Sequence, residues 1–182
     1  LRAARASSVL EGGALLPLSE TGEPDPLLAG ALRVSEALEG GATALVGVWQ
    51  KAPMQALARL HMLAAADLVD DDRLGRPRAD AEVGPRLELL VDIVTGKSEV
   101  PATVLAAVAH GELLTLAPFG IADGLVARGV SRLVTIASGR DPHGLGVPEV
   151  YWMRHSGDYR AAARGFASGT ADGLAAWLLL SC

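Results

Sequence analysis

The residues best suited to chemistry lie around a short loop near the middle of the chain, at 117–124. This loop contains Gly120 and Gly124, and Asp123 stands just before an apolar helical pattern. A glycine-containing loop at a helix N-terminus can bind an anion, because free backbone N–H groups and the helix dipole both favour negative charge there. Asp123 is a suitable N-cap for the helix that follows. The pattern therefore predicts a loop with the geometry of an anion site.

Three titratable residues near this loop could act as general acids or bases if the fold brings them into one pocket. They are Asp123 in the loop itself and His110 and Glu112 in the helical pattern before it. No nucleophile or metal ligand stands beside Asp123 in the sequence. The spacing alone therefore leaves open whether this region is an active site.

No metal site is predicted from the histidines or the acidic residues. Four histidines occur without metal-ligand spacing to one another or to a cysteine, namely His61, His110, His143 and His155. The first two stand in apolar helical patterns, which favours hydrogen-bonded core histidines, and the last two are expected at the surface. The run 70–72 is all aspartate but lacks the pattern of a calcium loop, which favours a solvated loop. Phosphate-loop, dinucleotide-binding and nucleophile-turn motifs are also missing from the sequence.

The composition favours one all-α domain over residues 1–182. Half of the residues are hydrophobic but only 4% are aromatic, so alanine, leucine and valine must form most of the core. A net charge of −5 argues against a nucleic-acid partner. The longest apolar run is too short to span a membrane, and no targeting segment is evident. The single cysteine, Cys182, cannot form an internal disulfide, so we expect a reducing compartment and a cytoplasmic protein.

Helical periodicity and turn residues divide the chain into segments that must position the loop. Helices are predicted at 1–13, 26–39, 53–68, 85–95, 101–116, 125–138, 156–168 and 171–180. The run 42–49 is ambiguous between helix and strand. The polar segment 69–83 is predicted to be an exposed loop, with a short hairpin flap as an option near 73–82. Residues 141–148 are expected to form an irregular connection rich in proline and glycine.

The sequence from Ala117 to Arg128 resembles the signature of the Fic family, His-x-Phe-x-Asp/Glu-Gly-Asn-Gly-Arg-x-x-Arg. Matches outside this motif follow in the same order: Leu60-His61, His110, Tyr159 and the run around Trp177. At the front, Ser7, Glu11 and Gly12 resemble the family's inhibitory motif, Ser/Thr-x-x-x-Glu-Gly/Asn. The resemblance covers 1–13 and about 53–180. It implies an all-helical Fic-like bundle, with an inhibitory-like helix at 1–13 and the motif region at 101–140.

The motif departs from the family at the positions that would carry the chemistry. Active members transfer AMP from ATP to a hydroxyl of a target protein. Here the catalytic histidine position is Ala117, and the position that would hold magnesium is Ile121. Ala122, Asp123 and Leu125 replace the family's glycine, asparagine and first arginine. The retained positions are Pro118, Phe119, Gly124 and Arg128. Loss of the general base, of an oxygen ligand and of a phosphate-binding cation predicts that ATP and Mg²⁺ bind weakly or not at all.

The family's inhibitory glutamate reaches the second arginine of the motif, and both residues are present here as Glu11 and Arg128. We therefore predict a buried ion pair between them, which would hold the N-terminal helix over the former nucleotide site.

Three functions stay open at this point. The first is a degenerate Fic-like pseudoenzyme that acts as a binding or scaffold module, with an unidentified protein as its partner. The second is an enzyme with altered chemistry that uses Asp123, Glu112 or His110. The third is a small-molecule binder whose pocket is enlarged at Ala117 and Ala122. The missing base and metal ligand favour the first, and the sequence does not indicate an oligomeric state.

Overall fold

The protein is described here from a computed structural model, which defines residues 1–14, 25–39, 43–96 and 99–182. These residues form ten α-helices and no strand, so the predicted all-α class is confirmed. The helices are α1 (Arg2–Glu11), α2 (Pro26–Leu38), α3 (Thr43–Lys51), α4 (Pro53–Ala65), α5 (Val83–Thr95), α6 (Ala102–Leu116), α7 (Asp123–Ala137), α8 (Pro148–Arg154), α9 (Ser156–Ala167) and α10 (Ala171–Ser181).

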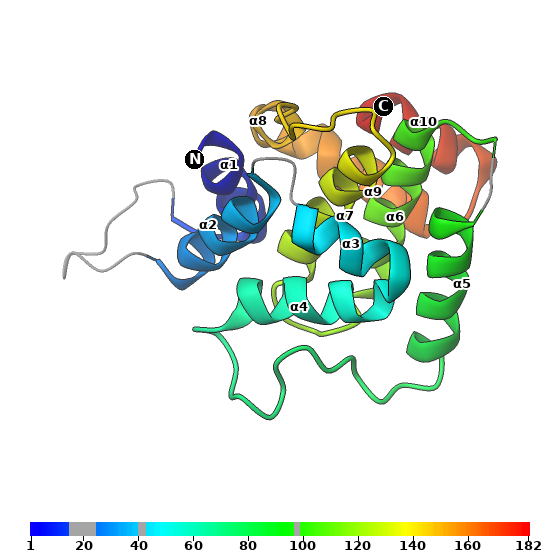
Figure 1. The fold of residues 1–182 in the computed structure, drawn as a ribbon. Helices are drawn as coiled ribbons and strands as arrows, with labels where there is room; N and C mark the ends of the chain where they lie inside the picture. Colours follow the sequence, from blue (N-terminus) through cyan, green and yellow to red (C-terminus); the bar gives the residue numbers. More distant parts are fainter. Residues whose placement is uncertain (15–24, 40–42, 97–98) are drawn as a thin grey trace.

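Helix α7 lies at the centre of the bundle, and α1, α2, α3, α4 and α6 all pack against it (Figure 1). Most of its residues are buried, including Leu125, Val130 and Leu133. An α-helix with an apolar stripe is stabilised mainly by covering that stripe, so α7 requires partners on several sides. Its position places Arg128, one turn from its N-terminus, in the interior of the protein.

A second, smaller core joins the C-terminal helices to α6. Trp152, Tyr159 and Trp177 form its buried centre, and the Trp177 indole donates to the carbonyl of Ala107 at 2.7 Å. His110 of α6 lies among these rings, with its centroid 4.7 Å from Trp152 and 4.9 Å from Trp177. The prediction that His110 is a core histidine is therefore confirmed.

Three local predictions differ from the structure. The ambiguous run at 42–49 is helical, as α3. Residues 148–154 form α8, a helix that the sequence analysis did not predict. Asp123 is the first residue of α7 and not its N-cap, because Ala122 occupies the cap position in a left-handed conformation.

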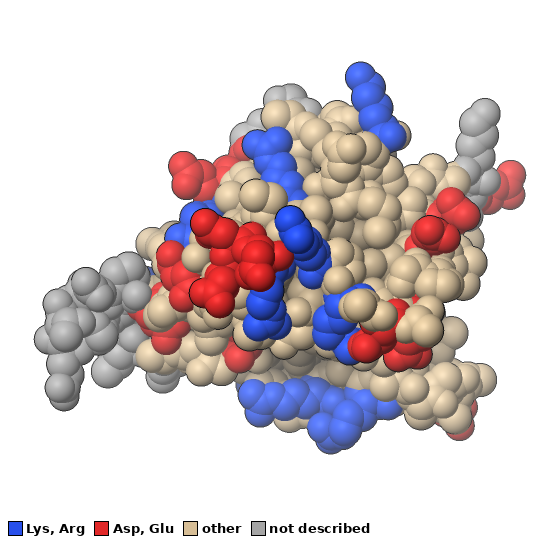
Figure 2. All heavy atoms as spheres, turned by 90° about the horizontal axis from the view of Figure 1, so that it is seen from below, with Lys and Arg blue, Asp and Glu red and all other residues tan. Residues whose placement is uncertain are grey.

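The exposed loop predicted at 69–83 is confirmed, but the short hairpin flap that the sequence left as an option near 73–82 is not formed. The segment between α4 and α5 consists of turns without strand pairing, and it runs below α4 in Figure 1. Acidic and basic side chains lie next to one another on this lower face (Figure 2). Two successive strands need a regular ladder of backbone hydrogen bonds, whereas here the backbone N–H of Arg78 bonds to the carbonyl of Pro118 in another loop. The segment is thus held by tertiary contacts to the 117–122 loop.

None of the helices within the described ranges combines the length and the apolar character that crossing a membrane would require.

Candidate functional site

The loop between α6 and α7 has an unusual backbone. Ala117 has φ of 45° and Ala122 has φ of 58°, both in the left-handed region that residues with a Cβ rarely adopt. The side chain of Asp123 turns back to this loop, and its Oδ1 accepts a hydrogen bond from the N–H of Phe119 at 2.8 Å. Strained backbone persists only when the surroundings hold it in place, so the contacts around this loop define its shape.

Arg78 provides one of these contacts from the polar segment. Its Nε donates to the carbonyl of Ala117 at 2.9 Å and its Nη2 to the carbonyl of Leu116 at 3.0 Å. These are carbonyls at the C-terminal end of α6, which lack partners within their own helix. A cation is also favoured at a helix C-terminus by the helix dipole. Arg78 therefore fixes the end of α6 and the start of the loop.

Phe119 provides the second contact. Its ring stacks on His61 of α4, with centroids 4.1 Å apart and planes inclined by 5°. The Nδ1 atom of His61 accepts a hydrogen bond from the N–H of Gly75 at 2.9 Å, and burial lowers the pKa of His61. The neutral imidazole thus connects the motif loop to the polar segment. The interpretation of His61 as a hydrogen-bonded core residue is confirmed.

Arg128 is the most heavily bonded residue of the site, and all three of its guanidinium nitrogens donate to other residues. Nε donates to Ser7 Oγ at 2.7 Å, and Nη2 donates to the carbonyl of Ser7 at 2.9 Å and to Glu11 Oε2 at 2.8 Å. Nη1 donates to the hydroxyl of Tyr159 at 3.4 Å. The ion pair expected between Glu11 and Arg128 is thus present, with side-chain exposures of 17% and 2%.

The other carboxylate oxygen of Glu11 binds the N-terminus of α7. Oε1 accepts from the N–H of Gly124 at 3.1 Å. A Cβ at position 124 would collide with Glu11 Oε2, so only glycine leaves room for this approach. A carboxylate at a helix N-terminus is favoured by the free N–H groups and the dipole. Glu11 therefore occupies the kind of position that the sequence predicted for an anion.

His110 is linked to this network through Tyr159. Its Nε2 lies 2.8 Å from the tyrosine hydroxyl, which also accepts from Arg128. Burial, together with the charge of Arg128, lowers the pKa of His110 well below 6.5, so its ring is neutral at pH 7. Tyr159 was identified in the sequence only through the resemblance, and its role as a bridge between two helices has no local signature.

The two remaining candidate acids, Glu112 and Asp123, both have structural partners. Glu112 forms an ion pair with Arg86 of α5 at 2.8 Å. Burial raises the pKa of Asp123 to about 6, against the lowering effect of its hydrogen bonds to the backbone of Phe119 and Gly120. Only Asp123 therefore remains at the loop, and its carboxylate is used to fold the loop.

The other motif positions carry apolar side chains. Leu125 is fully buried beside Arg128, and Ile121 is half-buried and packs on the main core. Neither can donate an oxygen or nitrogen ligand. In the described part of the chain, no group of three or more His, Cys, Asp or Glu side chains is arranged to hold a metal ion.

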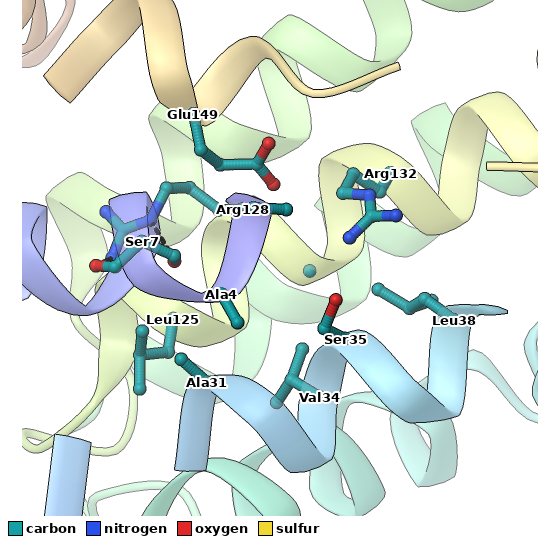
Figure 3. Close-up of a pocket in the computed structure, with 12 residues that line it drawn as sticks. Ala4, Ser7, Ala31, Val34, Ser35, Leu38, Leu125, Arg128, Arg132 and Glu149 are labelled. Carbon is teal, nitrogen blue, oxygen red and sulfur yellow. Dashed lines mark hydrogen bonds between the residues drawn. The ribbon is translucent and has the colours of Figure 1, made fainter. Parts of the chain in front are cut away.

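The cavity next to Arg128 is very small (Figure 3). It has a volume of about 10 Å³, room for about one water molecule, and lies between α1, α2 and α7. Arg132, one turn after Arg128 on α7, and Glu149 of α8 project toward it. Burial raises the pKa of Glu149, although the charge of Arg132 opposes the shift. Ala117 and Ala122 do not line this cavity or three further cavities of the described chain, which lie near Trp49, Trp152 and Phe166. These four cavities therefore lend no support to the pocket that those alanines were expected to enlarge.

Comparisons of the chain with family models, with curated proteins and with solved structures found no match.

Proposed function

We propose that this chain is a non-catalytic, Fic-like binding module in which α1 permanently fills the place of a nucleotide. The observation that carries the proposal is the bonding of Arg128. Each nitrogen of this buried guanidinium donates to a residue of the same chain, and Ser7 and Glu11 of α1 supply three of the four acceptors. A phosphate would have to displace a carboxylate that is already paired and hydrogen-bonded.

The side chains around the loop support the same proposal. Position 117 carries an alanine, which cannot accept a proton, and position 121 carries an isoleucine, which cannot bind Mg²⁺. The only carboxylate of the loop, Asp123, accepts a hydrogen bond from Phe119. A cavity of about 10 Å³ beside Arg128 is far below the several hundred Å³ of ordinary ligand sites.

With no chemistry left in the loop, the remaining function of such a domain is to bind. We propose that its partner is a protein, with the ion pair keeping α1 in place as part of the folded surface. The half-exposed Leu10 of α1, which packs against the core of the C-terminal helices, then stays in a fixed position, together with the half-exposed Val9 before it.

Calorimetric titration with ATP and Mg²⁺, followed by a transfer assay with labelled ATP, tests this function. We expect no binding heat and no labelled product. Glu11→Ala removes the carboxylate that competes with a phosphate for Arg128. It therefore distinguishes a site that is only blocked by Glu11 from a site that lacks catalytic groups, and we expect this variant to remain inactive in transfer. Glu36→Ala, at an exposed position of α2, is the matched control. Tight, Mg²⁺-dependent binding of ATP by the unmodified protein, or transfer of label by either protein, would overturn the proposal.

A further inference from the structure

A second cavity, of about 390 Å³, lies near the C-terminal end of α7 and is separate from the motif loop. Its walls come from α6, α7, the connection after α7, the start of α8 and the end of α10. This volume is within the range of small-molecule sites. Arg132 lines both this cavity and the small one beside Arg128.

Two arginines line the larger cavity. Arg132 is 8% exposed; its Nη2 donates to the carbonyl of Gly144 at 3.1 Å, and its buried Nε has no hydrogen-bond partner within the described ranges. Arg140 is exposed, and its side chain forms no ion pair with another described residue. A buried donor without an acceptor is costly, so an acceptor entering this cavity would be favoured.

Asp141, the one acidic side chain among the lining residues, does not neutralise both arginines. Asp141 accepts hydrogen bonds from the N–H groups of Leu145 and Gly146, at 2.9 and 2.7 Å. Burial alone would raise the pKa of Asp141, but these two donors, with the charges of Arg132 and His143, lower it. The carboxylate thus orders the connection after α7, and the lining side chains include two arginines against one aspartate. Glu149, the other acid near Arg132, lines the small cavity instead.

The rest of the wall combines hydroxyl groups with apolar surface. Ser131 and Thr135 lie one turn apart on α7, and Ser181 has a buried hydroxyl without a partner among the described residues. Pro148 and an edge of the otherwise buried Trp152 supply apolar surface from α8. Guanidinium groups bind carboxylate and phosphate oxygens in a bidentate manner, and an aromatic wall favours a flat apolar body.

We propose that this cavity binds a small organic anion, in which a carboxylate or phosphate head lies between Arg132 and Arg140 and an apolar body packs against Trp152. The site does not depend on the Fic-like motif, so it can be present whether or not the proposed function is correct.

The test uses the full chain and four probes. Benzoate and phenyl phosphate carry both parts of the proposed ligand, benzamide lacks the charge, and inorganic phosphate lacks the apolar body. Binding is followed by the backbone amide NMR signals of Ser131, Thr135 and Arg140. We expect benzoate or phenyl phosphate to shift these signals saturably, benzamide to leave them unchanged, and inorganic phosphate to bind more weakly than phenyl phosphate.

Arg140→Gln is the decisive variant, because an exposed side chain can be changed without loss of the fold. Removing one charged donor should weaken binding about tenfold. Arg160→Gln, at an exposed position of α9 that does not line the cavity, is the matched control and should bind as the unmodified protein does. Equal affinity in the two variants, equal binding of benzamide, or no saturable shift with either aromatic anion would overturn the proposal.

Discussion

Glu11 binds Arg128 with one carboxylate oxygen, at 2.8 Å, and the N-terminus of α7 with the other, at 3.1 Å. A single side chain of α1 thus satisfies a buried cation and a free helix N–H together. The arginine is almost completely buried, whereas the glutamate keeps 17% of its side chain exposed. Removing Arg128 should therefore lower the free energy of unfolding more than removing Glu11 does.

Arg128→Ala should strongly destabilise the protein. It removes the donors to Ser7 and Tyr159 as well as to Glu11, and leaves a mostly buried carboxylate without its partner. We expect a loss of about 3–5 kcal/mol in the free energy of unfolding, measured by urea denaturation. Glu11→Gln keeps a single acceptor oxygen, which can serve Arg128 or the N–H of Gly124 but not both. It leaves Arg128 its hydrogen bonds to Ser7 and Tyr159 and should therefore lose less than Arg128→Ala. Arg160→Ala, on the surface of α9, is the control. A loss below 1 kcal/mol for Arg128→Ala would show that the pair is not buried as described.

Gly124→Ala tests the close approach of Glu11 to α7. The new methyl group would occupy the position of Glu11 Oε2, so the glutamate must move away and α1 should loosen. We expect a loss of about 2–4 kcal/mol, of the size found when a buried charge pair is disrupted, and faster hydrogen exchange across α1. Gly47→Ala is the control, because its methyl group would enter open space in the interior of α3 and should stabilise the helix by about 0.5–1 kcal/mol. Similar changes in the two variants would contradict the packing seen at Gly124.

Asp123 should make stability depend on pH. Its pKa of about 6 lies above the ordinary 3.8, so between pH 4 and 6 the folded protein holds a proton that the unfolded chain has lost. Its contribution to stability therefore falls as the pH rises through this window. Asp123→Asn removes the buried charge and keeps an acceptor for the Phe119 N–H. We expect this variant to be more stable by about 1–3 kcal/mol at pH 8.

The readout for Asp123 is the difference between the variant and the unmodified protein across pH 4–8. His110 acts in the opposite sense, because its pKa is lowered and its contribution to stability is lost as the pH falls below 6.5. Both proteins share this effect, so it cancels in the comparison. Asp92→Asn, at an exposed position of α5, controls for the loss of one negative charge. A difference that stays constant with pH would show that Asp123 titrates in its ordinary range.

Arg78→Ala should release the loop between α6 and α7 without unfolding the bundle. The variant loses the two hydrogen bonds that the charged guanidinium of Arg78 donates to the carbonyls of Leu116 and Ala117. We expect a modest loss of about 1–3 kcal/mol and faster amide exchange at residues 117–122. Arg76→Ala, also exposed and two residues away, should leave this exchange unchanged. Slow exchange in Arg78→Ala would mean that the stack of Phe119 on His61 alone holds the loop.

The helical architecture could be predicted because it depends on local signals. Alanine and leucine at helical spacing, with Pro26 and Pro53 at the first helical positions, indicate where α2 and α4 begin. Helix α8 escaped prediction because it has only seven residues and follows a segment with three glycines. The conformation of Ala122 could not be foreseen either, since a left-handed alanine is unfavourable by itself and is held here by contacts from other elements.

Within the candidate site, the sequence could predict a contact only where both of its residues belong to a motif. Glu11 and Arg128 stood out because they occupy positions of one family resemblance. Arg78 did not, because nothing near it in the sequence shows that it will donate to carbonyls 38 and 39 residues away. Ser7 was identified as part of the inhibitory-like motif, but the use of its carbonyl by Arg128 depends on how α1 is placed on α7. Long-range acceptors of this kind follow from the assembled fold.

The bond between Glu11 and Arg128 joins residues 117 positions apart, and this separation has a consequence during synthesis of the chain. The helix that carries Glu11 leaves the ribosome long before the residue that neutralises it. Closing so long a loop costs conformational entropy, and this cost is offset only when the contact between Glu11 and Arg128 has formed. Until α7 has been synthesised and has packed into the bundle, Glu11 has no ion-pair partner. Helix α1 is then not yet stabilised by its contacts with α7. Helix α1 is therefore one that can complete its packing only after α7 has been synthesised.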